Sequence, residues 1–331
     1  MRTQENHIRS SWDHWWPKGI QRLWVNERKR VVEVDATGMV RERQPKKKVQ
    51  TAPIGAIFCG HKVDLRGPWS HSIEDDFAPV DNCAPKTISD ARFKFDFTKN
   101  ARLLGIWKAL VSLAFGCRKK LSTTRFAEVD CSENEFNEIL WIIFSLAIRS
   151  PRFRYINSFA AFGPWVGGSV KLEAPNLGRV WSIVSEFEYT KHFNCDFTFI
   201  FAHNSEFVFG DGLHDTVFKK KLSLQTRRDG YLPILNGEIL IALTPTMAGF
   251  LRISTPTIGE GSFVLRSMLA FDLEVDEVNQ ITAISSKKKL MGRREDLLLK
   301  YVPLLGEHQV ANLETATLPC YINQQRACMK A

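Results

Sequence analysis

The stretch that decides the fold is Ser132–Arg149, which reads SENEFNEILWIIFSLAIR. Ser132 is a favoured N-cap residue, and Glu133 and Glu135 suit the positive end of the helix dipole. Apolar residues then recur at helical spacing: Phe136, Ile139, Leu140, Ile143, Phe144, Ala147 and Ile148. Pro151 cannot continue the segment. We therefore predict a central helix that is largely buried.

The segments on both sides of this helix favour strands. Two β-rich runs, Leu23–Val25 and Val31–Val34, flank the charged stretch Asn26–Arg30, which predicts a hairpin turn. Thr37-Gly38 predicts a second turn. Strand patterns resume after residue 180 at Val180–Val184, Phe197–Ala202, Phe207–Phe209, Glu238–Leu243, Gly249–Ile253 and Ser262–Met268, and residues 272–290 return to a helical pattern.

Two further helices are expected before the central one. Ser70 or Ser72 can cap a helix that begins near Ile73 and that Pro79 and Pro85 limit or kink, and Ala101–Phe115 forms an apolar helix. The fold class predicted is α+β, with an N-terminal β-meander, central buried helices and a C-terminal antiparallel sheet closed by a helix. We expect one composite domain over residues 1–305, with a possible seam at 152–180 and an irregular tail at 306–331.

Composition narrows the class of protein. The chain has 331 residues, 44% hydrophobic and 24% charged, which is typical of a globular protein and argues against disorder or collagen. Lys and Arg number 45 against 36 Asp and Glu; the resulting +9 permits a polyanionic partner without requiring one. Seven scattered Cys form no C-x-x-C pair, which argues against a zinc ribbon. No apolar run reaches the roughly 20 residues of a membrane span, so we expect a cytoplasmic protein with no membrane contact.

Three places carry candidate chemistry, each with a structural alternative. Gly210-Asp211-Gly212 ends a buried strand, where an Asp can hold a metal or form an Asx-turn. Arg149 ends the central helix, where it can bind a carboxylate or phosphate in bidentate fashion or satisfy the last carbonyls. Asn279 lies inside a helical segment, on its solvent face or as the anchor of a buried network. No P-loop, G-x-G-x-x-G, G-x-S-x-G or H-E-x-x-H pattern is present.

Aromatic and basic residues alternate near the N-terminus. Trp12, Trp15, Trp16 and Trp24 are interleaved with Arg9, Lys18, Arg22 and Arg28. This pattern suits a surface that stacks bases and binds phosphates. It equally suits an N-terminal segment that packs its indole rings onto the core.

The motifs also occur in a characteristic order: His7, Leu23–Arg28, Ser72–Glu74 with Asp81 and Ala84-Pro85, Arg149-Ser150-Pro151, Gly210-Asp211-Gly212, Ala242–Pro245 and Asn279. This order resembles a large bacterial family of unknown function, number 4238 in the domain-of-unknown-function series. The chain departs from the family where Leu146 replaces a Gln and where Gly-Asp-Gly replaces Ser-Asp-Asn-Pro. The resemblance implies a phage-defence or toxin-like setting and no established activity.

Three functions remain open. The first is a metal-dependent nuclease with the catalytic residues His7, Asp211, Arg149 and Asn279, and with Mg²⁺ or Mn²⁺ held by Asp211, Glu74 and Asp81. The second is a non-catalytic module that binds nucleic acid or a protein partner, and the third is a structural subunit. For the first, we predict that His7, Arg149, Asp211 and Asn279 meet in one pocket.

Overall fold

A computed structural model of the chain describes residues 12–45, 56–58, 62–63, 71–72, 74–96, 126–151, 153, 180–218, 224–227, 230–257 and 259–306. These residues form an α+β fold, as predicted. In the part so described, no helix is both long enough and apolar enough to cross a membrane. The predicted helix Ala101–Phe115 lies outside the described residues, as do most of the seam and of the tail, so the domain organisation stays a prediction.

A six-stranded sheet forms the centre of the molecule. Its order is β10 (His214–Asp215), β13 (Gly237–Thr244), β14 (Met247–Ser254), β8 (Asn194–Ala202), β15 (Ser262–Ala270) and β7 (Phe126–Glu128). Adjacent strands are antiparallel except β8 and β15, which run parallel. The C-terminal sheet was predicted to be antiparallel, which holds for four of its five strand pairings; β8 with β15 is the exception, because the alternation of apolar residues along a strand does not record its direction.

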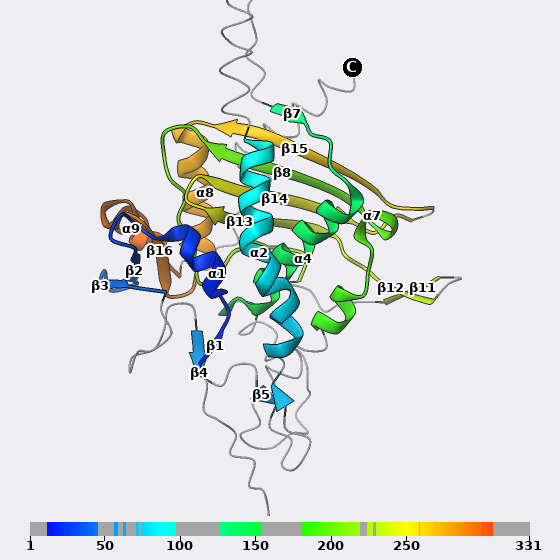
Figure 1. Ribbon diagram of the computed structural model, residues 1–331, viewed down its shortest axis with the longest axis horizontal. Coiled ribbons are helices and arrows are strands. Elements are labelled where there is room, and N and C mark those ends of the chain that lie inside the picture. Colours follow the sequence, from blue (N-terminus) through cyan, green and yellow to red (C-terminus); the bar gives the residue numbers. More distant parts are fainter. Residues whose placement is uncertain are drawn as a thin grey trace, which may run out of the picture.

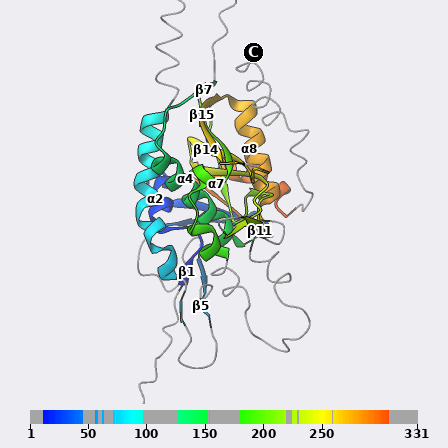
Figure 2. The same cartoon turned by 90° about the vertical axis from the view of Figure 1, so that its right-hand side faces the viewer.

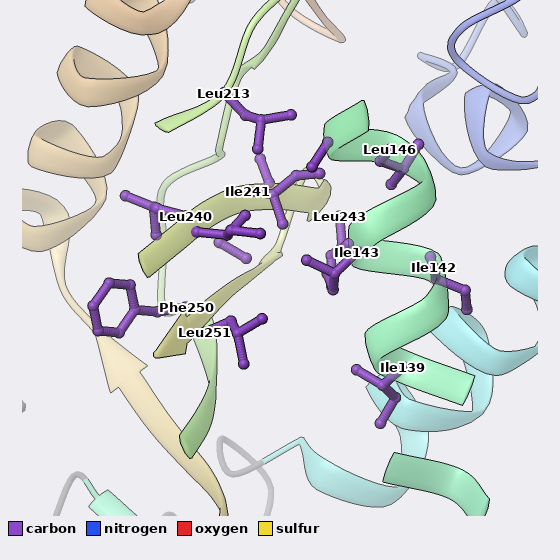
Figure 3. Close-up of a cluster of buried hydrophobic side chains, with 14 of the residues drawn as sticks. Ile139, Ile142, Ile143, Leu146, Leu213, Leu240, Ile241, Leu243, Phe250 and Leu251 are labelled. Carbon is purple, nitrogen blue, oxygen red and sulfur yellow. The ribbon is translucent and has the colours of Figure 1, made fainter. Parts of the chain in front are cut away.

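Helices cover both faces of this sheet. Helices α2 (Glu74–Phe95) and α4 (Glu133–Arg149) lie on one face and α8 (Asp272–Ser285) lies on the other (Figures 1 and 2). Ser132 and Glu135 form the capping box that starts α4. Ile143 of α4 lies against Leu243 of the sheet, while Phe250 points to the opposite side (Figure 3). The predicted burial of this central helix is thus confirmed, since twelve of its residues are buried.

Helix α2 is longer than its prolines led us to expect. It runs without interruption through Pro79 and Pro85, which were expected to limit it. Phe77, Val80 and Ala84 belong to the core beneath the helix. Burial of this apolar face outweighs the backbone hydrogen bonds that the two prolines cannot make.

In a second, four-stranded sheet, strands from the N-terminal part of the chain pair with a strand from its C-terminal part. Its order is β3 (Val40–Arg43), β2 (Val31–Asp35), β16 (Lys289–Gly292) and β9 (Phe209–Gly210). The predicted turn between β2 and β3 is confirmed, with the Gly38 amide donating to the Asp35 carbonyl at 2.9 Å. The predicted strand Leu23–Val25 is wrong, because Arg22–Trp24 form a 3₁₀ helix, η1. The Trp24 indole is buried there and donates to the Leu243 carbonyl.

Short elements complete the described fold. They are β1 (Trp12–His14) with β4 (Ala56–Phe58), β5 (Lys62–Val63) with β6 (His71–Ser72), β11 (Leu224–Arg227) with β12 (Gly230–Pro233), α1 (Lys18–Gln21), α7 (Tyr189–His192), α9 (Glu295–Tyr301) and η2 (Val302–Leu304). Residues 180–185 are helical, so the strand predicted at Val180–Val184 was wrong. Val180, Trp181 and Val184 are buried at helical spacing, and a short apolar run does not distinguish a helix from a strand.

Candidate functional site

Arg149 binds a carboxylate in bidentate fashion, and that carboxylate belongs to the same chain. Its Nη1 and Nη2 donate to Asp81 at 2.9 and 2.6 Å, and Nε and Nη2 also donate to the carbonyl and hydroxyl of Ser145. The guanidinium is fully buried and lies 4.4 Å from the ring centroid of Phe77. The pair therefore connects α4 to α2, and Arg149 is not an open clamp for an external anion.

Asp211 is buried and accepts hydrogen bonds from the backbone. Its carboxylate receives the amide of Lys287 at 2.7 Å and that of Lys288 at 3.0 Å. Burial raises the pKa of this carboxyl above its ordinary value, while the two amides act in the opposite direction. Asp211 thus satisfies the backbone that leaves the end of α8, which is a structural role but a long-range one, and not the local Asx-turn that the sequence offered as the alternative.

The glycine before Asp211 allows this contact. A Cβ at Gly210 would lie 1.7 Å from Oγ of Ser286, the residue that follows α8. Ser286 Oγ lies 2.7 Å from the Thr282 carbonyl, its closer acceptor, and 3.4 Å from the Gly212 carbonyl. The close backbone approach expected at Gly-Asp-Gly is therefore made to the end of a helix.

Gly210→Ala tests this packing. We expect the free energy of unfolding to fall by about 1–3 kcal/mol, because the new methyl group overlaps Ser286 and must displace α8 or β9. Urea denaturation measures the change. The double variant Gly210→Ala/Ser286→Ala removes the overlapping hydroxyl and should recover part of the loss. Equal losses in single and double variants would show that Ser286 is not the obstacle.

Asn279 anchors a buried network, one of the two alternatives given by the sequence. Its Oδ1 accepts the Val208 amide at 2.8 Å, and its Nδ2 donates to the Glu206 carbonyl at 3.0 Å and to the Tyr301 hydroxyl at 3.4 Å. The side chain is buried. These bonds tie α8 to the loop before β9 and to α9, and they satisfy both ends of the amide.

The predicted common pocket is not formed by the three residues that can be placed. Arg149 and Asp81 lie in the layer of α2 and α4, and Asn279 lies in α8 across the six-stranded sheet (Figure 2). Asp211 contacts the segment after α8 through bonds separate from those of Asn279. His7 is outside the described residues, and Glu74 is placed only as the first residue of α2.

The described residues do not provide a set of side chains that could bind the predicted metal ion. Among the residues that the structure describes, no group of three or more His, Cys, Asp and Glu side chains is arranged to hold a metal ion. Asp81 is bonded to Arg149, and Asp211 to backbone amides. A requirement for Mg²⁺ or Mn²⁺ stays a prediction of the nuclease hypothesis.

The three tryptophans whose burial is described belong to the core, so of the two alternatives left open by the sequence the base-stacking surface does not hold for them. Trp15, Trp16 and Trp24 are at most 5% exposed. Trp16 stacks on Phe209 with ring centroids 4.5 Å apart and meets Trp24 edge-on. The packing alternative is confirmed for these residues, because indoles buried against β9 cannot receive bases.

Tertiary structure brings together two basic segments whose proximity the sequence did not reveal. β16 pairs with β2, which brings residues 22–43 next to the connection 286–294 between α8 and α9. Together these segments contain eleven Lys and Arg but only four Asp and Glu. The register of β2 with β3 places Arg41 and Glu42 on opposite faces of the sheet, so these cations lie on both of its faces. The basic residues of the two segments, together called the basic surface below, are Arg22, Arg28, Lys29, Arg30, Arg41, Arg43, Lys287, Lys288, Lys289, Arg293 and Arg294. The short basic runs were a signal, but only strand pairing shows that they meet.

A tight turn presents the first group of cations. Asn26 Oδ1 accepts the amides of Arg28 and Arg30, each at 3.0 Å. Lys29, at the tip, is exposed and has a φ of 59°, in the left-handed region that favours glycine. Arg28 and Arg30 share the carboxylate of Glu42, at 4.0 and 3.3 Å. The turn therefore holds three cations close to two acids, Glu42 and the exposed Glu27 of the turn itself.

A buried acid positions the second group. Glu33 is only 2% exposed, and its Oε1 lies 3.0 Å from Lys289 Nζ and 3.6 Å from an Arg41 nitrogen. The carbonyl of the exposed residue Lys288 accepts the Ala36 amide at 3.0 Å, which places Lys288 beside the β2–β3 turn. Glu33 thus fixes two partly exposed cations next to a third.

Comparisons with known proteins found no match to this chain. No protein-family model matches the chain. No curated protein and no solved structure matches it either.

Proposed function

We propose that the protein is a non-catalytic nucleic-acid-binding module that binds through the basic surface. The observation that carries this proposal is that two distant segments with eleven basic and four acidic residues meet on paired strands. Two further acids, Glu206 and Asp296, pair with Arg293 and Arg294, and the exposed Lys29 and Lys288 extend beyond these ion pairs. Lys and Arg that neutralise phosphates release counterions, and this release supplies most of the affinity for a polyanion. The family resemblance suggests phage defence as the biological setting.

The nuclease hypothesis receives less support from the geometry. Arg149, Asp211 and Asn279 are buried and bonded within the chain, on elements that hold the fold together. Phosphodiester cleavage needs charge neutralised at the scissile phosphate and a group that moves a proton. The basic surface supplies the first of these, which is sufficient for binding alone.

Fluorescence anisotropy with a labelled 20-base-pair DNA duplex tests the proposal. We expect the affinity to fall as salt rises from about 50 to about 200 mM, with a slope in a logarithmic plot of about −0.9 for each phosphate neutralised. An acidic polypeptide such as polyglutamate should compete weakly. No duplex binding at about 50 mM salt, or tighter binding of polyglutamate than of the duplex, would overturn the proposal in favour of a protein partner or a structural role.

Two variants, Lys29→Gly and Lys288→Gln, test whether the DNA binds to the basic surface. Each should reduce the steepness of the salt dependence by about 0.9, because each removes one phosphate contact. Lys29→Gly should leave the fold intact or stabilise it, since glycine adopts a positive φ without steric cost. A loss of binding by this variant therefore cannot result from unfolding.

Lys191→Gln is the matched control. Lys191 lies on α7, far from β2 and β3 (Figure 1), and forms a surface ion pair with Glu188. Its removal changes the net charge by the same amount and should leave duplex binding unchanged. The same mixtures, incubated with Mg²⁺ or Mn²⁺ and run on a denaturing gel, should show intact DNA. Cleavage that requires the metal ion, and that an Asp211→Asn protein shown to be folded by circular dichroism lacks, would instead establish the nuclease.

A further inference from the structure

We infer that Glu42 is an internal competitor of the nucleic acid. Its carboxylate occupies Arg28 and Arg30 in the free protein, and a backbone phosphate displaces it on binding. This inference rests on the proposed function and adds the site at which a phosphate binds and the group that opposes it. It follows from the contrast between Glu42 and Glu33, the acids that hold two groups of cations on opposite faces of the sheet.

Glu42 holds its two arginines loosely. Its carboxylate oxygens lie 4.0 Å from a terminal nitrogen of Arg28 and 3.3 Å from one of Arg30. Strong hydrogen bonds between a guanidinium and a carboxylate are about 2.7–2.9 Å long and often bidentate, and neither contact has this geometry. The two arginine side chains are 78% and 46% exposed, and that of Glu42 is 28% exposed. Water and salt therefore reach these pairs, and pairs of this type add little to stability.

Glu33, on the other face of the sheet, is the opposite case. Its side chain is only 2% exposed, and its Oε1 lies 3.0 Å from Lys289 Nζ and 3.6 Å from an Arg41 nitrogen. Removal of this buried acid would leave two cations close together without compensation. Glu33 therefore belongs to the fold, whereas Glu42 can leave its partners without a comparable loss.

The turn that carries the two arginines keeps its backbone shape without Glu42. Asn26 Oδ1 accepts the amides of Arg28 and Arg30, each at 3.0 Å, and the Lys29 amide donates to the Asn26 carbonyl at 2.8 Å. These bonds lie within the turn itself, so the positions of its three cations do not depend on the acid. Guanidinium groups bind phosphate oxygens in bidentate fashion, which the present contacts with Glu42 do not achieve. A phosphate can therefore replace the carboxylate with better geometry.

Duplex binding by the full-length Glu42→Gln protein tests the inference. Glutamine keeps the shape of the side chain but carries no charge that competes with a phosphate. Fluorescence anisotropy with the labelled DNA duplex at about 100 mM salt should show an affinity at least about threefold higher than that of the unchanged protein. Circular dichroism checks that the variant is folded. A smaller gain, no change or a loss of affinity would overturn the inference.

Glu27→Gln is the matched control. Glu27 is exposed in the same turn, but Glu42 is the acid that pairs with Arg28 and Arg30. The two substitutions change the net charge equally, so the general attraction of a more basic protein for DNA affects both. We expect the gain in affinity from Glu42→Gln to be at least about twice that from Glu27→Gln. Equal gains would reveal only this general effect and would overturn the inference.

Removal of the two arginines provides a second readout. In an Arg28→Gln/Arg30→Gln protein, the further change Glu42→Gln should alter duplex affinity by less than about 1.5-fold, because the acid acts through these two cations. A gain as large as that in the unchanged background would overturn the inference. Either negative result would leave nucleic-acid binding itself in place, whereas the absence of duplex binding by the unchanged protein and by Glu42→Gln would remove the proposed function as well.

Discussion

Asp81→Ala is expected to lower the free energy of unfolding by about 3–5 kcal/mol. The substitution leaves the Arg149 guanidinium fully buried without the carboxylate that accepts two of its hydrogen bonds. An uncompensated charge in the core is among the most destabilising changes known for single residues. Urea denaturation followed by circular dichroism measures the effect.

The double variant Asp81→Leu/Arg149→Met is the control for this prediction. Replacement of a buried ion pair by apolar residues of similar volume is often neutral or stabilising. We therefore expect the double variant to be more stable than Asp81→Ala, although it has lost both charges. A loss below about 0.5 kcal/mol in Asp81→Ala would show that water compensates the guanidinium and that the pair contributes little.

Ile143→Ala should lower the free energy of unfolding by about 2–5 kcal/mol. Ile143 is 1% exposed and lies in α4 between the sheet and α2 (Figure 3). It already borders a small apolar cavity, together with Thr87, Ile88, Ala91, Ile139, Ile142, Phe199 and Leu243. Truncation enlarges this cavity, and rigid neighbours on three elements limit the collapse that would reduce the cost.

Asn134→Ala provides the comparison within the same helix. Asn134 is exposed in the first turn of α4, and its truncation should change stability by less than about 0.5 kcal/mol. Denaturant titration of both variants separates burial from helix propensity, because alanine is a good helix former at either position. Similar small effects in the two variants would place α4 at the periphery of the fold.

The predicted helices and strands agree with the structure where local and tertiary preferences coincide. Ser132 and Glu135 form the capping box of α4, and the apolar residues of this helix are buried on both of its sides. The disagreements occur where packing overrides local preference. Trp24 was expected in a strand but lies in a 3₁₀ helix with its indole bonded to Leu243, and Pro79 lies inside a helix rather than at its end.

Arg149 and Asp211 lie at the ends of a helix and a strand, as predicted, but the groups that they contact determine their roles. Arg149 was expected to meet an external anion, and Asp81 occupies it. Asp211 was expected to hold a metal, and the amides after α8 bond to it. A sequence records which group is present, but hydrogen-bond partners 68 or 76 residues away depend on the packed fold.

The sequence by itself determined the α+β class, the buried central helix, the turn at Gly38 and the positions where polar residues needed partners. Local periodicity and capping carry this information, because they act over a few neighbouring residues. Only the tertiary structure decided that β8 and β15 run parallel and that Asn279 anchors a network. It alone also brought the segment with the Arg28–Arg30 turn beside the segment with the Lys287–Lys289 run, since strand pairing between distant segments depends on long-range burial that no local pattern encodes.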